Sequence, residues 1–178
     1  DEYGNSTELA VADWQDEIFR TATTQDYNAS VSGAGEKGYY SFSGNYSKQD
    51  GIIKNSGYER YSLRANISSK ITDWLEMGTN TSFTNSTTNF ANTLSYNTGI
   101  VRSALLFPPT YGPNMDTTQA DDLNWLAANP AAYVNNTKDE LTAINYFSSS
   151  YLEVKLFPFL KFRQNLGLSY NDQHRGPY

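Results

Sequence analysis

"SGYERYSLRANISSKITDWLEMG" (Ser56–Gly78) decides the fold, because its apolar and polar residues alternate. The apolar positions ahead of its turn are Tyr61, Leu63, Ala65 and Ile67. Arg60 and Arg64 stand among the polar residues between them. Successive side chains of a β-strand point to opposite faces of a sheet, so the stretch predicts a strand with one apolar and one polar face.

The same alternation recurs along most of the chain and predicts six strands. We expect them at Asp26–Gly33, Tyr39–Gln49, Tyr58–Lys70, Leu75–Phe83, 151–156 and 160–170, with a loop after Tyr170. The longest of these strands, Tyr58–Lys70, has 13 residues, whereas a typical strand of a globular protein has about 5–6. A tilted strand needs about 9–11 residues to cross the hydrocarbon layer of a membrane. The lengths therefore favour a transmembrane sheet.

The connections between the predicted strands also follow a pattern that is typical of outer-membrane barrels. Short connections alternate with longer ones: Gly33–Gly38, Asp50–Gly57, Ile71–Asp73, 87–140 and Phe157–Phe159. Barrels of this kind have short periplasmic turns, longer extracellular loops and aromatic residues at both membrane interfaces. Aromatic residues also gather at the predicted strand ends. Because Ile71–Asp73 and Phe157–Phe159 are very short connections, we expect them on the periplasmic side.

Composition excludes several other classes of protein. The 178 residues carry a net charge of -6, and such an acidic chain lacks the basic surface that binds nucleic acid. The chain has no cysteine, which excludes disulfides and thiolate metal sites within it. No apolar run approaches the roughly 20 residues of a membrane-spanning helix. The 14 tyrosines and 9 phenylalanines favour β-structure.

Three short helices are expected outside the strands. Apolar spacing predicts one within Leu9–Arg20, and Gly99–Phe107 predicts a second that Pro108 and Pro109 end. Asp121–Pro130 predicts a third, with Pro130 as its stop. The last two lie in the 87–140 segment, which exceeds the roughly 12–15 residues of a long connection and so is expected to have a function.

The residues of the chain give little support for a catalytic function. His174 is the sole histidine, and a Ser–His–Asp or zinc site would depend on it. The adjacent acids Asp121 and Asp122 fit a solvated pair or a helix cap better than a general acid and base. We therefore expect no enzyme, no catalytic residue, no cofactor and no metal. A glycan hydrolase would need a carboxylate pair in a groove, and no residues in the chain point to one.

Binding and membrane contact suggest three sets of candidate residues. Aromatic rings stack on sugars or peptide side chains, so the substrate-contact candidates are Trp125, Tyr96, Tyr111 and Phe90. The alternative is that these rings pack the loop against itself or against a plug. On the apolar face the lipid-facing candidates are Leu63, Ile67, Phe42, Leu152, Val154 and Leu166. On the polar face the candidates for a barrel lumen are Arg60, Arg64, Lys161 and Arg163, which we expect to pair with acidic groups. We interpret Trp14 and Phe19 as packing anchors.

A soluble β-sandwich that binds glycans is the alternative interpretation, since soluble antiparallel sheets also alternate. In that fold the face of Leu63 and Ile67 would pack against a second sheet. In a barrel the same face would contact lipid.

Several stretches resemble the SusC/RagA family of TonB-dependent outer-membrane transporters. They are "DWQDEIFRTA", "ALLFPPTYGP", "NPAAYV", "YLEVKLFPFLKFRQNLGLSY" and, most specifically, Tyr27–Gly78. They follow the family order and cover nearly the whole chain. The resemblance implies an all-β fold, an antiparallel transmembrane β-barrel, of which this chain is a partial, early piece with long extracellular loops and short helices. Residues 1–25 would be an outer-loop segment with a short helix, and 26–178 the barrel wall with a long extracellular loop at about 87–140.

The resemblance also implies a function in transport. Members of the family import large nutrients, oligosaccharides or peptides, through the outer membrane of Gram-negative bacteria, where they are multi-pass proteins. The TonB complex drives import through a plug, which this chain lacks, and a SusD-like surface lipoprotein covers the barrel. The expected partners are therefore that lipoprotein, the TonB complex, membrane lipid and the nutrient, without nucleic acid.

Overall fold

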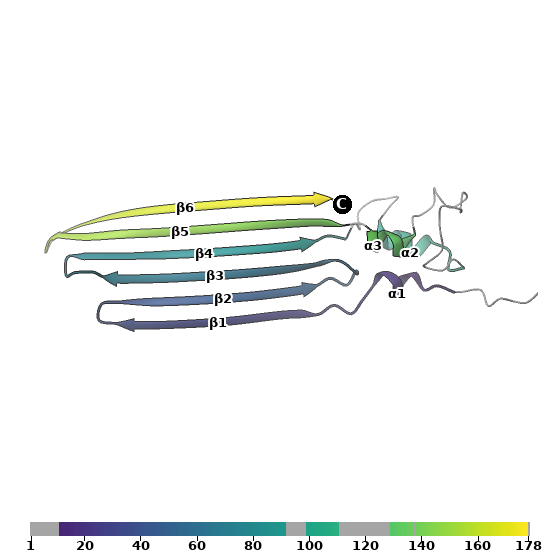
Figure 1. The fold of residues 1–178 in the computed structure, drawn as a ribbon, viewed down its shortest axis with the longest axis horizontal. Helices are drawn as coiled ribbons and strands as arrows, with labels where there is room; N and C mark the ends of the chain where they lie inside the picture. The colour runs from purple at the N-terminus through teal and green to yellow at the C-terminus, as the bar shows by residue number, and fades with distance from the viewer. Residues whose placement is uncertain (1–10, 92–98, 111–128, 137, 178) are drawn as a thin grey trace, which may run out of the picture.

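The computed structural model describes residues 11–91, 99–110, 129–136 and 138–177. Six antiparallel strands lie side by side in chain order and form one sheet (Figure 1). Their bounds are Thr24–Gly35 (β1), Gly38–Asp50 (β2), Gly57–Lys70 (β3), Leu75–Asn89 (β4), Asp139–Phe157 (β5) and Leu160–Pro177 (β6). The described helices are Trp14–Ile18 (α1), Ile100–Leu106 (α2) and Pro130–Asn136 (α3).

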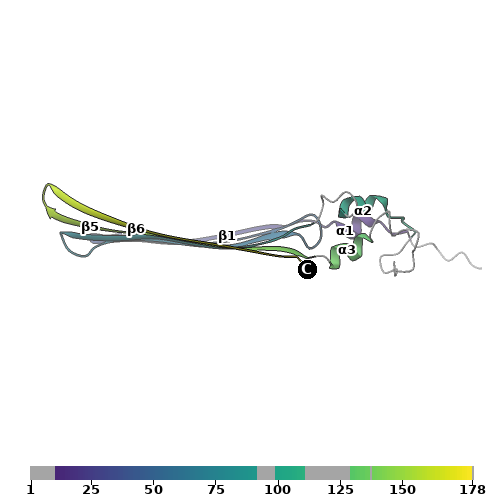
Figure 2. The same ribbon diagram turned by 90° about the horizontal axis from the view of Figure 1, so that it is seen from above.

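The sheet is a single twisted layer, and the described helices lie beyond the ends of its strands rather than over a face (Figure 2). Each strand pairs with the next in the chain, and β1 does not pair with β6 in the described residues, so the sheet is open. The prediction of six antiparallel strands is confirmed, and the open sheet fits a partial barrel.

Three predicted strand ends are wrong by more than two residues. β4 continues to Asn89, beyond the predicted end at Phe83. β5 begins at Asp139, well before 151, and β6 continues to Pro177, although a loop was expected after Tyr170. The two extensions pair with each other, from Tyr146 opposite Tyr170 to Asp139 opposite Pro177. In the β6 stretch 171–177 there is no large apolar residue, and in the β5 stretch the apolar residues Leu141, Ile144, Tyr146 and Phe147 do not alternate regularly with polar ones, so neither sequence shows a clear contrast between the two faces.

The three short turns lie at the end of the sheet away from the helices (Figure 1). Residues 36–37, 71–74 and 158–159 make these turns, and each successive turn lies farther from the helices. Strand length rises accordingly, from 12 residues in β1 to 19 in β5. Such a stagger accompanies strands that tilt against a barrel axis. At the first turn Gly38 has a φ of 156°, and a Cβ there would overlap the carbonyl oxygen of Ser68.

The helices begin and end at residues with identifiable chemistry. The Asp13 carboxylate caps α1 by accepting from the backbone N–H of Gln15 at 2.9 Å. The helix ends before Phe19, which is extended and pairs with Ile53, and it lies within the stretch Leu9–Arg20 in which a short helix was predicted. α2 confirms the helix predicted before Pro108.

Pro130 begins a helix, so the prediction that it ends one is wrong. The Asn129 side chain caps α3, where its Oδ1 accepts from the backbone N–H groups of Ala131 and Ala132 at 3.0 and 3.2 Å. A proline suits the first turn of a helix, because no intrahelical acceptor is available there for the N–H group it lacks. The rest of that predicted helix, 121–128, lies outside the described residues.

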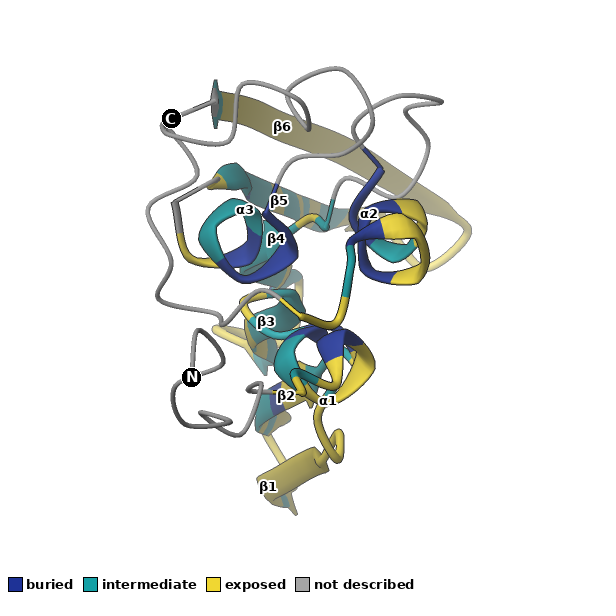
Figure 3. Cartoon of the chain, turned by 90° about the vertical axis from the view of Figure 1, so that its right-hand side faces the viewer, coloured by how far each residue is buried: buried dark blue, intermediate teal, exposed yellow. Residues whose placement is uncertain are grey.

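Most of the buried apolar side chains lie among the helices, not on the sheet (Figure 3). This cap core consists of Trp14, Ile18, Ile53, Ile100, Ala104, Phe107, Ala131 and Val134. The Trp14 ring meets the Phe107 ring edge-on at 4.9 Å, and its Nε1–H donates to the Pro108 carbonyl oxygen at 3.1 Å. Trp14 is thus a packing anchor, and Phe19 packs against the cap core half-buried.

Among the described residues, no helix has the length and apolar character needed to cross a membrane.

Candidate functional site: two faces of a sheet and a hollow beside the helices

One face of the sheet, the apolar face, carries the residues predicted to contact lipid. Directly opposed residues of an antiparallel pair share a face. Leu63 lies opposite Gly44 and Phe83, and Ile67 lies opposite Tyr40 and Thr79. Followed across all pairs, this register places on one face Leu63, Ile67, Phe42, Leu152, Val154 and Leu166.

The apolar face is uncovered in the described part of the chain. Leu63 exposes 61% of its surface and Leu166 exposes 69%, while Val154 is half-buried between its neighbours. A soluble sheet would bury such residues against another layer, at about 1.5–3 kcal/mol for each large apolar side chain. The face therefore needs a covering that is itself apolar.

Aromatic side chains lie at both ends of the apolar face. Toward the helices, the Tyr46 ring lies 6.2 Å from the Tyr27 ring and 4.9 Å from the Tyr61 ring. The hydroxyl groups of Tyr46 and Tyr61 donate to Glu59 at 2.8 and 2.7 Å. Toward the turns, the rings of Phe157 and Phe159 stack at 5.6 Å. Rings at two levels match the aromatic girdles of membrane barrels.

The other face, the polar face, carries the four residues predicted for a lumen: Arg60, Arg64, Lys161 and Arg163. Glu153 of β5 lies opposite Arg163. Its carboxylate forms one ion pair with Lys161 at 3.2 Å and another with Arg163 at 3.8 Å. These two cations pair with an acid on the neighbouring strand, as expected, whereas Arg60 donates to the Asn45 amide oxygen at 3.2 Å.

A tyrosine network on the polar face joins four strands near the turns. The Tyr151 hydroxyl donates to Glu76 at 2.8 Å and lies 3.1 Å from the Ser68 hydroxyl. The Arg163 guanidinium lies 4.1 Å from the centroid of the same ring. Polar contacts of this kind fix the register of β3 to β6 without a buried core.

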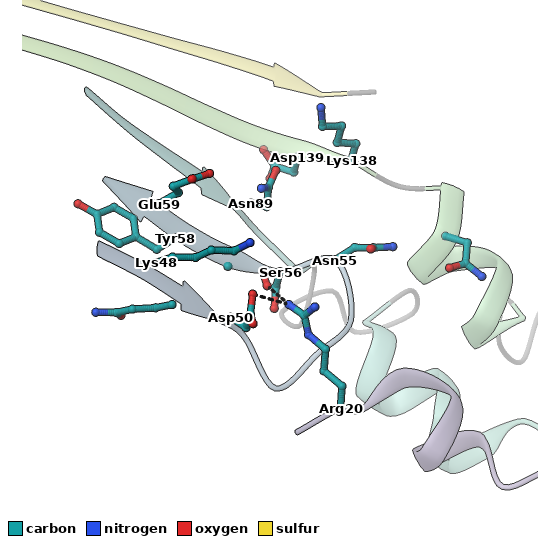
Figure 4. Close-up of a pocket in the computed structure, with 13 residues that line it drawn as sticks. Arg20, Lys48, Asp50, Asn55, Ser56, Tyr58, Glu59, Asn89, Lys138 and Asp139 are labelled. Atoms are coloured by element: carbon teal, nitrogen blue, oxygen red, sulfur yellow. Dashed lines mark hydrogen bonds and ion pairs between the residues drawn. The ribbon is translucent and has the colours of Figure 1, made fainter. Parts of the chain in front are cut away.

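A polar hollow of about 430 Å³ lies where the strands meet the helical end (Figure 4). Three acids, Asp50, Glu59 and Asp139, and three cations, Arg20, Lys48 and Lys138, line it. Sequence reasoning missed this site, because its residues come from five segments that only the strand register brings together. The clustering of charged and amide residues at predicted strand ends was the one available signal.

Arg20 lies at the edge of this hollow and binds the loop between β2 and β3. Its Nε donates to the Gly51 carbonyl oxygen at 3.0 Å, and its Nη2 donates to that of Ser56 at 2.8 Å. The same Nη2 lies 3.6 Å from the Asp50 carboxylate. A hydrogen bond from the Thr23 hydroxyl, together with the charge of Arg20, lowers the pKa of Asp50 although partial desolvation opposes this. The loop between β2 and β3 is thereby fixed beside α1.

Phe90 is the one aromatic substrate-contact candidate that lies within the described residues. Trp125, Tyr96 and Tyr111 lie outside the described residues. Phe90 follows β4, and the Arg175 guanidinium lies 5.1 Å from its ring centroid. Arg175 itself donates from Nε to Asp139 at 2.8 Å, so Phe90 packs on an ion pair at the strand ends.

Comparison with known proteins supports the fold and the resemblance. No protein-family model matches the chain. The TonB-dependent receptor P3 of Formosa agariphila is 30% identical over 180 residues, which cover 95% of this chain and 18% of that receptor. The TonB-dependent receptor SusC of Bacteroides thetaiotaomicron is 35% identical over 85 residues, 47% of this chain and 8% of SusC. The chain thus spans less than a fifth of the relatives' length.

Two solved structures share the fold. One is the RagAB peptide importer in its closed-closed state and the other is the RagAB peptide transporter. Each matches with a TM-score of 0.70 and 20% identity over 99% of this chain and 21% of the neighbour. The six strands accordingly form a partial antiparallel transmembrane β-barrel. On these likenesses the chain belongs to the SusC/RagA family of TonB-dependent receptors and corresponds to a segment of their barrel.

Proposed function

We propose that the chain forms part of the wall and outer loops of an active importer of large nutrients in the outer membrane of a Gram-negative bacterium. The observation that carries this proposal is the uncovered apolar face, which continues across six strands between two levels of aromatic side chains. Lipid is the covering that such a face requires. The similarity to TonB-dependent receptors supports the same function.

In this function the two faces have different tasks. The apolar face contacts lipid through Leu63, Ile67 and their neighbours, and the polar face lines a lumen through Arg60 and Arg64. The short turns face the periplasm, and the helices with the hollow of Figure 4 face the outside. The wall encloses the nutrient and carries out no reaction, so the energy for import comes from the TonB complex through parts of the protein beyond this chain.

The proposed partners follow from the relatives. A SusD-like lipoprotein would dock on the outer loops, as the two-component name RagAB suggests for the structural neighbours. The nutrient would be an oligosaccharide or a peptide, and the RagAB structures are those of a peptide importer. The 90–138 segment, which carries all four aromatic candidates, is the proposed contact region for nutrient and lipoprotein.

Extraction and mass test this proposal. Membranes of the source bacterium would be washed with carbonate, extracted with detergent and probed with an antibody against residues 24–89. We expect the signal only in the detergent extract of outer membranes, at a mass several times 20.0 kDa. A signal near 20.0 kDa in the fraction that needs no detergent would contradict the proposal and favour the soluble glycan-binding sandwich.

A further inference from the structure

A second hollow, of about 750 Å³, lies on the polar face across β1 to β4. Its charged lining residues are Asp26, Arg60 and Arg64, so its charge is +1. Serine, threonine and asparagine side chains make up most of the remainder. It is separate from the hollow beside the helices, because the two hollows share no lining residue. They come nearest in sequence in β3, where Glu59 lines the first and Arg60 the second.

Asn45 organises the polar groups of this hollow. Its Nδ2 donates to Asp26 at 3.1 Å and to the Asn28 side-chain oxygen at 2.7 Å. Its Oδ1 accepts from Arg60 Nη2 at 3.2 Å. Amide groups therefore satisfy the Asp26 carboxylate, and Arg60 is oriented by a neutral acceptor rather than by an acid.

The two guanidinium groups retain unused donors. The Arg60 Nε is buried and has no hydrogen-bond partner in the described part of the chain. Arg64, four residues farther along the same face, forms no hydrogen bond or ion pair with any described residue. A guanidinium edge matches the two oxygens of a carboxylate, and a buried donor without an acceptor favours a ligand that supplies one.

We propose that this hollow binds the carboxylate of an acidic oligosaccharide, one that contains uronic acid units, during its passage. The inference rests on the proposed importer function and narrows its substrate class. Arg60 and Arg64 supply the positive charge for the carboxylate, and the short hydroxyl and amide side chains around them match the hydroxyl groups of a sugar ring. An acidic peptide would meet the same charge but would find few apolar groups for its side chains.

Calorimetry on the full-length protein in detergent tests the proposal. The probes are trigalacturonate, its fully methyl-esterified form, which has the same size without the charge, and triglutamate. The variants are Arg60→Gln and Arg64→Gln, and the second is expected to fold normally because Arg64 has no bonded partner among the described residues. Lys37→Gln is the control, since it removes one positive charge from an exposed turn outside the hollow.

We expect the wild-type protein to bind trigalacturonate at least about tenfold more tightly than its ester. Arg64→Gln removes that preference, whereas Lys37→Gln retains it. Equal affinity for acid and ester, no binding of either, or tighter binding of triglutamate would overturn the proposal. It would also be overturned if Arg64→Gln lowered the melting temperature of the ligand-free protein but left the preference intact, because an acid of the protein itself would then occupy the hollow.

The same preparation separates this inference from the proposed function. A protein that requires detergent and supports nutrient uptake, but does not distinguish trigalacturonate from its ester, refutes only the acidic substrate. A protein that is soluble without detergent refutes the importer itself.

Discussion

The Tyr151 ring lies directly over Gly78, its opposite residue in the β4–β5 pair. A Cβ on Gly78 would overlap two carbon atoms of that ring and its hydroxyl oxygen. The glycine thus makes room for the tyrosine to reach Glu76 and Ser68 on the polar face. A glycine inside a strand marks a close approach of this kind.

Gly78→Ala is expected to lower the free energy of unfolding of the full-length protein by about 1–3 kcal/mol, because the added methyl group displaces the Tyr151 ring. Denaturant titration in lipid vesicles measures it. Gly167→Ala is the matched control, since Gly167 also lies within a strand on the polar face and its Cβ would meet nothing within 4 Å. Equal effects of the two substitutions would show that the Tyr151–Gly78 contact has no role in stability.

Trp14→Ala is expected to disorganise the helices without opening the sheet. Trp14 is 3% exposed, and truncation of a buried aromatic residue costs about 3–5 kcal/mol. The helices touch the sheet mainly through the loop between β2 and β3, so the loss stays local. Hydrogen exchange should become faster in α2 and α3 but not in β3. Val11→Ala, at an exposed site, is the control and should leave exchange unchanged in the helices and in β3. Faster exchange throughout the sheet would contradict the separation of cap core and sheet.

The loop between β2 and β3 is expected to loosen in acid. The pKa of Asp50 is lowered from its ordinary value of 3.8, so its bonds to Thr23 and Arg20 stabilise the fold above that value. That stabilisation is lost as the pH falls through the lowered pKa. Hydrogen exchange in residues 51–56, corrected for the intrinsic effect of pH, should rise below about pH 4.

Asp50→Asn provides the control for this pH effect. The variant cannot titrate at position 50, so its loop should exchange at one corrected rate from neutral to acid pH. If the variant and the wild-type protein respond to acid alike, another group controls the loop.

Leu63→Arg is expected to block assembly of the barrel, because an arginine on the lipid side costs about 2–4 kcal/mol near the middle of the membrane. Ser62→Arg places the same side chain one residue away on the polar face and should assemble. Resistance of the folded protein to unfolding in cold detergent, read as a mobility shift in gel electrophoresis, measures assembly. Equal yields of the two folded variants would argue against lipid on the apolar face.

The sequence predicts the fold where alternate residues differ strongly in polarity. The contrast between Leu63 and Arg64 sufficed to assign both faces of β3. The same alternation of apolar and polar residues assigned the faces of β1, β2 and β4. The start of β5 and the end of β6 could not be predicted, because runs such as Ser148–Ser150 look alike from either face. Pro130 was misread because a proline can begin a helix as well as follow one.

The polar sites were harder to predict than the faces. Asn45 and Asp26 lie 19 residues apart, and only the register of β1 against β2 brings them together. The hollow beside the helices depends in the same way on strand ends that meet across the sheet. A single sequence carries no direct signal of register, so such sites emerge only from the structure.

The most direct test of a lipid-facing wall compares two adjacent residues. The chain has no cysteine, so a fluorophore can be attached at Leu63→Cys or at Arg64→Cys of the full-length protein, in which any cysteine beyond this chain has been replaced. The protein is then placed in vesicles that contain phospholipids with nitroxide-labelled acyl chains. We expect strong quenching of the fluorophore at position 63 and weak quenching at position 64. Equal quenching at the two positions, or stronger quenching at 64, would contradict a barrel wall whose apolar face contacts lipid.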